Sequence, residues 1–321
     1  MSQRNVDWQP TASRSVLAIR ARMLRIARDW LDRKGALEVE TPTLGRAAVT
    51  DVHLASITAH VCGELRYLHT SPEFAMKRLL AAGYGDVWQI GRVYRDGESG
   101  RLHNPEFTMI EWYRTGLDHH ALMREVAELV TEMVAGQRSL ELPRYLTYQD
   151  VFAEHTGVDP LHDPLRAIVR ALATGGIEGP ESLGDDRDAW LDLAMATIVG
   201  PRLGHDRLTF VYDYPASQAA LARRRGPVAS RFELYLDGRE LANGFHELSD
   251  AGEQRERMQA DLAQRLARGL PAVPVDAAFL AGLEHGLPDC AGVALGFDRL
   301  VMCAVGADDI ADVIALPFDR A

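Results

Sequence analysis

The sequence predicts an α+β domain in which an antiparallel sheet is flanked by helices. Three observations favour this fold class. A chain of 321 residues that is 47% hydrophobic is long enough to bury one large core. No repeats are present, and helical patterns precede and follow the strand-like segments. These segments, separated by hairpin-length or helical connections, are 87–95, 106–114, 208–213, 231–247 and 291–296. We expect a single domain over 1–321 with a helical insertion at roughly 118–206.

The first elements along the chain are a helix and a short strand. Residues 13–34 carry apolar side chains at helical spacing, and Gly35 suits the C-terminal cap. The stretch "ALEVETP" then alternates apolar and acidic residues and stops at Pro42, which suits an edge strand.

A second strand-to-helix junction follows in "YLHTSPEFAMKRLLAAG". Ser71 suits the N-cap, Pro72 the first helical position and Gly83 the far end. Glu73 is therefore expected in the first helical turn.

The middle and the C-terminal third are predicted to contain more helix. Residues 118–200 read as mostly helical, interrupted by the Gly-rich acidic loop "ATGGIEGPESLGDD". Asp250 with Glu253 resembles a capping box, which predicts a helix running to about Arg268.

Composition excludes several classes of function. The net charge of -11 weighs against a broad nucleic-acid surface, which needs a contiguous field of Lys and Arg. No apolar run is long enough to span a membrane, and the N-terminus lacks the features of a signal peptide, so we expect a cytoplasmic protein. Cys62, Cys290 and Cys303 are isolated, so we expect core thiols and neither disulfides nor a structural metal.

The first candidate for chemistry is a hairpin made of "VWQIGRVYR" and "PEFTMIEWYR". Arg95, at the end of its first strand, could clamp a phosphate or a carboxylate. Period two places Phe107, Met109, Glu111 and Tyr113 on one face. The long connection "DGESGRLHN" is rich in charged side chains, although a solvated surface remains the alternative reading.

The second candidate is the hairpin in "RFELYLDGRELANGFHEL". The turn Asp237-Gly238 fixes a register in which Tyr235 opposes Glu240 and Glu233 opposes Ala242. Glu233 and Glu240 are then diagonal neighbours on one face. They would bind a divalent cation, most plausibly magnesium, or else both face water. Glu247 falls on the opposite face unless a bulge at Asn243-Gly244 restores it.

The third candidate is "CAGVALGFDRLVM", in which a strand ends at Gly296 and a helix opens with Asp298 and Arg299. A glycine at this junction permits close approach of a flat ligand, although simple packing would explain it as well. The usual P-loop and dinucleotide-binding patterns are missing.

Together these pieces resemble the three motifs of a class II aminoacyl-tRNA synthetase core, at 16–42, 88–114 and 292–302. Within that class, "TSPEFAMKRLL", "HNPEFTMIEWY" and "ELANGFHEL" resemble the lysyl-tRNA synthetase branch. The first core helix begins too close to Met1 to leave room for an anticodon-binding domain. With "FVYDYPASQAAL" and "GVALGFDRL", the chain is similar to the elongation factor P lysine ligase family.

That resemblance implies an activity, partners and cofactors. The family activates lysine, preferentially (R)-β-lysine, with ATP and magnesium, and joins it to a lysine side chain of elongation factor P rather than to tRNA. The first motif implies a homodimer. The alternatives are a truncated synthetase that charges tRNA, and a non-catalytic paralogue that senses an amino acid and ATP.

The resemblance also implies roles for particular residues. Arg95 and Arg299 would be catalytic, on the α-phosphate and the γ-phosphate end, and Glu233 and Glu240 would bind magnesium. The other expected ATP contacts are Asp96, Gly97, Glu98, His103, Asn104, Phe107, Leu241 and Gly296, together with Glu240 and the two arginines. The expected amino-acid contacts are Ser71, Pro72, Glu73, Tyr113, Asn243, Phe245, Glu247 and Ala294.

Two positions depart from the synthetase pattern. The usual Arg-x-Glu is absent, because Asp96 and Gly97 separate Arg95 from Glu98. Ala294 stands where lysyl-tRNA synthetases have Gly, as it does in the ligase family, and its methyl group would alter the pocket wall.

Overall fold

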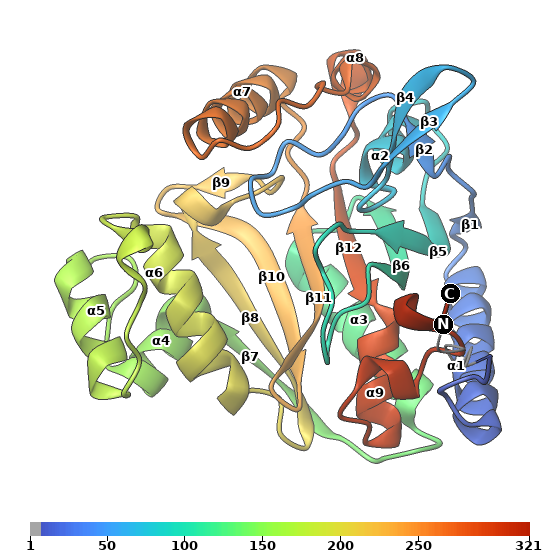
Figure 1. Cartoon of the computed structure of the whole chain (residues 1–321), viewed down its shortest axis with the longest axis horizontal. Coiled ribbons are helices and arrows are strands. Elements are labelled where there is room, and N and C mark those ends of the chain that lie inside the picture. The colour runs from blue at the N-terminus through green and yellow to red at the C-terminus, as the bar shows by residue number, and fades with distance from the viewer. Residues whose placement is uncertain (1–7) are drawn as a thin grey trace, which may run out of the picture.

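A computed structural model of the chain describes residues 8–321 and is built around one large sheet (Figure 1). The strand order is β1-β5-β6-β12-β11-β10-β8-β7, with β9 paired to β10. Neighbours are antiparallel except β1–β5 and β7–β8 at the two ends. The strands are β1 (Leu37–Glu38), β5 (Val87–Tyr94), β6 (Glu106–Thr115), β7 (Glu141–Thr147), β8 (Arg207–Pro215), β9 (Arg224–Arg225), β10 (Val228–Leu236), β11 (Arg239–His246) and β12 (Cys290–Gly296). The predicted α+β class is confirmed.

Three helices share the main core with the sheet. They are α1 (Arg14–Arg33), α3 (His119–Val134) and α9 (Phe297–Val305). Alternate strand residues such as Ile110, Trp112 and Val293 project into this cluster. Because side chains alternate along a strand, the residues between them face the other side of the sheet.

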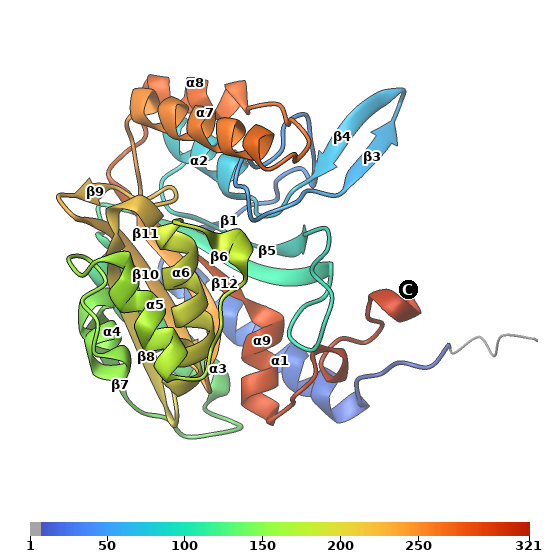
Figure 2. The ribbon, with the colours of Figure 1, turned by 60° about the vertical axis from the view of Figure 1, so that its left-hand side comes forward.

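A second group of helices lies at one end of the sheet. It comprises α2 (Glu73–Ala81), α7 (Ala251–Ala267) and α8 (Ala277–Gly286), with α2 and α8 packed together through Met76, Leu80 and Phe279. A small sheet in the order β2-β4-β3 adjoins them, and its hairpin projects from the body in Figure 2. Its strands are β2 (Leu44–Gly45), β3 (Thr58–Val61) and β4 (Glu64–Leu68).

The middle of the chain packs mainly as a separate helical cluster beside β8 (Figure 1). Its helices are α4 (Tyr148–Thr156), α5 (Leu165–Thr174) and α6 (Arg187–Ala194), followed by a π-helical turn, Met195–Val199. The expectation of mostly helix over 118–200 missed β7, which pairs in parallel with β8 at the sheet edge. The predicted Gly-rich loop is present, with one short 3-10 turn, Glu181–Leu183.

Local capping signals mark the helix ends. The Asp250 side chain accepts from Glu253 N, as the capping-box pattern predicts. Ser13, expected inside the first helix, is its N-cap and accepts from Val16 N. Gly35 follows α1 with a φ of 75°. Before α2, the Ser71 hydroxyl accepts from Glu73 N, although the helix itself begins one residue later than expected.

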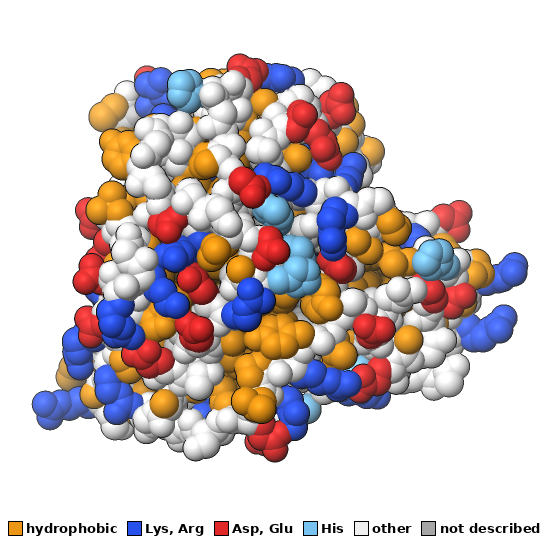
Figure 3. Space-filling model, turned by 180° about the vertical axis from the view of Figure 1, so that it is seen from behind, with side chains coloured by type: hydrophobic (Ala, Val, Ile, Leu, Met, Phe, Trp, Pro, Cys, Tyr) orange, Lys and Arg blue, Asp and Glu red, His pale blue; other side chains and the backbone are white. Residues whose placement is uncertain are grey.

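The surface carries interspersed charges. Figure 3 shows Lys and Arg side chains alternating with Asp and Glu over the face behind the view of Figure 1. None of the helices within 8–321 combines the length and the hydropathy needed to cross a membrane. Cys290 and Cys303 are buried free thiols, but Cys62 is exposed, so the expectation of three core thiols was wrong for Cys62. Cys62 sits with a φ of 53° in the turn between β3 and β4, away from any core.

Candidate active site

Two rows of residues that include most of the buried polar side chains of the sheet cross its face opposite the main core. One row, read across register partners of five strands, is Gln89, Glu111, Ala294, Asn243 and Glu233. The next row is Val87, Tyr113, Gly292, Phe245 and Arg231. The predicted shared face of Glu111 and Tyr113 is confirmed, and it forms part of a continuous floor.

A β-bulge aligns the second hairpin with this floor. Asp237 and Gly238 both have positive φ, as a type I′ turn requires, and Tyr235 pairs with Glu240 as predicted. The register then shifts, so that Leu234 opposes Ala242 and Glu233 opposes Asn243. The extra residue is Leu241, so the predicted pairing of Glu233 with Ala242 and the predicted bulge position were wrong. The bulge nevertheless returns Glu247 to the face of Glu240.

Three carboxylates and one ammonium group meet at one end of the floor, and we call this group the carboxylate cluster: Glu73, Glu111, Glu247 and Lys77. Lys77 Nζ lies 2.5 Å from Glu73 Oε1 and 2.6 Å from Glu247 Oε2. Burial opposes a charged Lys77, but Glu247 and Glu73 outweigh burial and raise its pKa above the ordinary value.

Glu111 is the most extensively hydrogen-bonded carboxylate of the cluster. The Ser71 hydroxyl donates to Oε2 and the Tyr113 hydroxyl donates to Oε1, each at 2.7 Å. Burial, followed by the charge of Glu73, raises the pKa of Glu111 to about 7. Burial also raises the pKa of Glu247 to about 8, although Lys77 opposes the rise. One ammonium group cannot neutralise three carboxylates, so the ligand-free cluster holds a proton near neutral pH.

One carboxylate oxygen of Glu247 has no hydrogen-bond donor among the described residues. Its Oε1 is buried and makes no hydrogen bond to any residue within 8–321. A Cβ at Gly292 would lie 2.5 Å from this oxygen and would collide with the Tyr113 ring. Gly292 therefore lets Tyr113 and Glu247 converge above β12, and an unpaired buried carboxylate oxygen there suits a ligand that carries an ammonium group.

Arginines gather at the other end of the floor. The Arg95 guanidinium stacks over Phe107 at 5.1 Å, and Arg95 Nη1 lies 3.6 Å from Glu98. Arg299 donates to the carbonyl oxygens of Leu102 and Glu240 and contacts His103 Nε2 at 2.6 Å. Arg299 thus joins the hairpin loop to β11.

The remaining residues expected near ATP occupy different environments. Asp96 and Gly97 are exposed in the loop. The Asn104 amide is engaged inside the protein, since it donates to Glu106 O and accepts from Phe318 N. Leu241 is buried in the main core as the bulge residue. A Cβ at Gly296 would meet only Leu241 O at 3.5 Å, so protein packing alone does not require glycine there.

The two expected metal ligands lie side by side but differ in their partners. Glu233 accepts from Arg231 and from the Tyr235 hydroxyl, both at 2.6 Å. No hydrogen bond or ion pair reaches the Glu240 carboxylate from the described part of the chain. Burial and the neighbouring Glu233 raise the pKa of Glu240 to about 7.

This donor set fits a magnesium ion that also binds phosphates. No group of three or more His, Cys, Asp and Glu side chains in residues 8–321 is arranged to hold a metal. Magnesium is commonly bound through one or two carboxylates plus substrate phosphates, so two carboxylates beside the arginines suffice.

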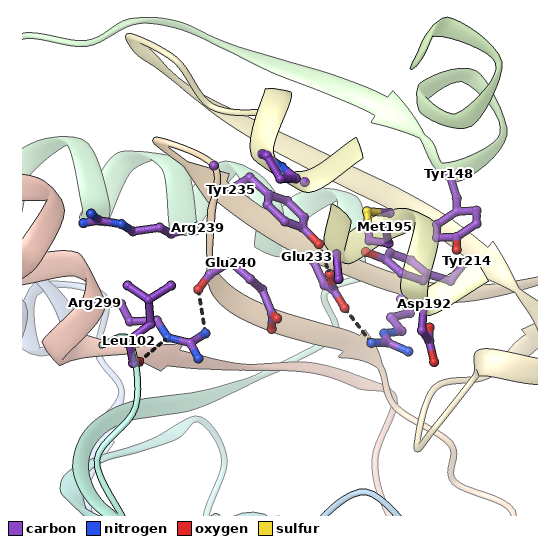
Figure 4. A pocket seen from close by; sticks show the side chains of 15 residues that line it. Leu102, Tyr148, Asp192, Met195, Tyr214, Glu233, Tyr235, Arg239, Glu240 and Arg299 are labelled. Carbon is purple, nitrogen blue, oxygen red and sulfur yellow. Dashed lines mark hydrogen bonds and ion pairs between the residues drawn. The ribbon is translucent and has the colours of Figure 1, made fainter. Parts of the chain in front are cut away.

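A cavity of about 290 Å³ opens beside these carboxylates (Figure 4). Glu233, Glu240 and Arg299 line one side, and Tyr148, Asp192 and Met195 of the helical cluster line the other. The helical cluster thus borders the arginine end of the floor. Burial raises the pKa of Asp192 to about 6.

Several site-lining residues lay outside the predicted set, Tyr148, Asp192 and Met195 of the cavity wall among them, and three more contact predicted residues. Glu111 appeared in the predicted face but in no assigned role, and its raised pKa and two hydrogen bonds place it inside the cluster. Lys77 reads as an ordinary surface lysine of an amphipathic helix. Arg231 is revealed only by its contacts, since it donates to Glu233 and to Asn243 Oδ1 and stacks over Tyr214.

An antiparallel floor of this kind, with an Arg-bearing hairpin on one side and a strand–Gly–Asp–Arg helix on the other, defines the catalytic domain of a class II synthetase. The family model described as tRNA synthetases class II (D, K and N) matches residues 1–320, and the chain belongs to that family.

Three relatives match this chain over nearly its whole length. The chain is 48% identical to a protein of Vibrio cholerae serotype O1, over 99% of each chain. It is 47% identical to a protein of Edwardsiella ictaluri and 46% identical to one of Proteus mirabilis, over 98% of each chain. All three are named elongation factor P–(R)-beta-lysine ligase.

Proposed function

We propose that this chain is an ATP-dependent ligase that activates lysine or (R)-β-lysine and transfers it to a lysine side chain of elongation factor P. The observation that carries this proposal is the carboxylate cluster, with its unpaired Glu247 oxygen, on the sheet face of Glu240, whose cavity Arg299 also lines. The names of the relatives supply the acceptor.

The reaction proceeds in two displacements. The substrate carboxylate attacks the α-phosphorus of ATP and pyrophosphate leaves, giving an aminoacyl-adenylate. The neutral amine of the acceptor lysine then attacks the carbonyl carbon, AMP leaves, and the amine gives up a proton as the amide forms. Catalysis of this kind rests on positioning and on stabilising the charge that develops on phosphate oxygens.

In this proposal each group of residues contacts the part of the substrates that lies nearest to it. Arg95 faces the α-phosphate, Phe107 and Arg299 hold the nucleotide, and Glu73, Tyr113 and Glu247 bind the ammonium groups of the amino acid. Glu233 and Glu240 would hold magnesium, which offsets the charge of the phosphates when it is bound.

The test separates activation from acceptor choice. Lysine-dependent exchange of pyrophosphate into ATP measures adenylate formation. Incubation with ATP, (R)-β-lysine, elongation factor P and tRNA together, followed by mass spectrometry of the protein and an acid-gel assay of the tRNA, identifies the acceptor. We expect one adduct on a single lysine of elongation factor P. Efficient charging of tRNA without that adduct would make the chain a tRNA synthetase, and no exchange would favour a sensor.

A further inference from the structure

Lys77 is a buried cation for which the reaction above has no use. It lies on α2 with 2% of its surface exposed, and its ammonium group contacts Glu73 and Glu247. The rings of Tyr113 and Phe279 lie at about 6 Å from Nζ. Well-packed apolar side chains are often at least as stabilising as buried ion pairs, so stability alone does not explain a lysine here.

Lys77 fixes where the free acceptor of Glu247 points. Because Oε2 is held 2.6 Å from Nζ, the other oxygen is turned toward Gly292 and Tyr113. The same ammonium group holds Glu73 Oε1, which lies one turn earlier on α2. Both carboxylates would otherwise repel each other and Glu111.

Lys77 also sets the charge of the cluster. The titratable side chains facing it come from α2, β6, β12 and the segment after β11. They are Glu73, Glu111, Tyr113, Glu247 and Cys290. Burial keeps the Tyr113 hydroxyl and the Cys290 thiol neutral by raising their pKa values. Three carboxylates and one ammonium group then leave two negative charges when all are ionised.

We propose that Lys77 is a positioning residue that fixes Glu73 and Glu247. Its positive charge leaves the pocket with two negative charges, which the two ammonium groups of a diamino acid neutralise. This inference rests on the proposed function, because it concerns the same amino-acid site. It adds that discrimination against amino acids with one ammonium group depends on a cation supplied by the protein.

The test compares Lys77→Met with Arg78→Met, which removes an exposed cation from the next position of the same helix. Calorimetric binding and pyrophosphate exchange are measured with lysine, with norleucine and with 6-aminohexanoate, which each lack one ammonium group. We expect Lys77→Met to raise the KM for lysine about 100-fold or more and to erase the preference for lysine, with little change in the KM for ATP. Arg78→Met should behave as the wild type, and propylammonium should partly rescue Lys77→Ala.

Proton exchange gives a second readout that needs no variant. The ligand-free cluster holds a proton near neutral pH, and a bound ammonium group replaces it. Calorimetry at pH 7.5 in two buffers of different ionisation enthalpy should therefore show net proton release when lysine binds the wild type.

The outcomes distinguish this inference from the proposed function. If the wild type binds no diamino acid, the proposed function fails and the role of Lys77 with it. If the wild type binds lysine but Lys77→Met keeps its affinity and its preference, only the role of Lys77 is overturned. If Lys77→Met does not fold, Lys77→Ala decides, and a Lys77→Ala protein that keeps the affinity and the preference for lysine without added amine overturns the inference.

Discussion

Arg20 of α1 and Asp298 of α9 form a largely buried ion pair that, through Thr108 of β6, joins three segments distant in sequence. Asp298 Oδ2 accepts from Thr108 N at 2.6 Å, and Arg20 Nη2 donates to Thr108 Oγ1 at 2.8 Å. The Arg20 guanidinium also stacks over Phe297 at 4.8 Å. Since Thr108 follows Phe107 and Asp298 precedes Arg299, this pair sets the spacing of the two side chains proposed to hold the nucleotide.

Removing Arg20 should therefore destabilise the fold and loosen the nucleotide site together. Arg20→Met leaves Asp298 buried without its partner, which costs about 3–5 kcal/mol of unfolding free energy. Urea unfolding measures this loss, and the KM for ATP should rise in parallel. Arg28→Met removes an exposed pair with Glu38 and should cost about 1 kcal/mol or less. A similar small loss for Arg20→Met would contradict the prediction.

Glu240→Gln should abolish adenylate formation without lowering the stability of the metal-free protein. Glu240 and Glu233 repel each other in the absence of a cation, so the neutral amide should leave the metal-free protein at least as stable as the wild type. Adenylate formation should be abolished, because one of two proposed metal ligands is lost. Pyrophosphate exchange across a magnesium titration and thermal unfolding in EDTA measure the two effects. Near-normal exchange at ordinary magnesium would remove Glu240 from the metal site.

The pH dependence of stability should reflect the carboxylate cluster together with Glu240, whose pKa is also raised to about 7. The pKa of Glu111 is raised to about 7 and that of Glu247 to about 8, from an ordinary 4.5, so the folded state binds more protons than the unfolded state in between. The resulting stabilisation is complete below about pH 4.5 and is lost as the pH rises through 7 to 8. Urea unfolding without ligand should give a lower free energy at pH 8 than at pH 6, by up to about 1.4 kcal/mol per pH unit for each group. Glu111→Gln should flatten this slope, and an unchanged slope would place the protons elsewhere.

The chain is expected to form a homodimer through its N-terminal segment. The first motif builds the two-fold interface in class II cores, and Leu37 and Leu44 on the short strands of this segment are exposed in the single chain. Light scattering at micromolar concentration should give the mass of two chains. Leu37→Glu with Leu44→Glu should shift the mass to that of one chain, and a monomeric wild type would contradict the prediction.

The features that could be predicted from sequence depend on local patterns. The turn Asp237-Gly238 specifies its own geometry, so the pairing of Tyr235 with Glu240 followed from it. The bulge at Leu241 did not, because it depends on how β11 packs between β10 and β12. β7 was missed because "ELPRYLT" contains a proline and mixed charges, and its pairing with β8 is a long-range contact.

The carboxylate cluster also could not be predicted from local sequence patterns. Glu73, Tyr113 and Glu247 were assigned through resemblance, but their convergence with Lys77 depends on α2 packing over the ends of β6 and β12. An amphipathic pattern cannot distinguish a lysine that faces water from one that faces three carboxylates. Only the folded chain shows that Lys77 is buried.

Gly292→Ala should disable amino-acid recognition while sparing the nucleotide. Gly292 pairs with Tyr113 across the β12–β6 ladder and with Phe245 across β11. An added methyl group would collide with the Tyr113 ring and approach Glu247 Oε1, so both side chains must move. Overpacking of this kind costs about 1–3 kcal/mol of stability. The KM for lysine should rise by more than the KM for ATP, because Arg95 and Arg299 lie at the other end of the floor.

The matched control is Gly282→Ala on α8. A Cβ there meets Arg78 Cγ at 3.4 Å, an ordinary contact, and alanine favours a helix over glycine. It should leave both KM values unchanged and preserve or raise the melting temperature. If Gly292→Ala uses lysine as well as this control does, Tyr113 and Glu247 can separate without loss, and the proposed amino-acid pocket does not depend on their convergence above β12.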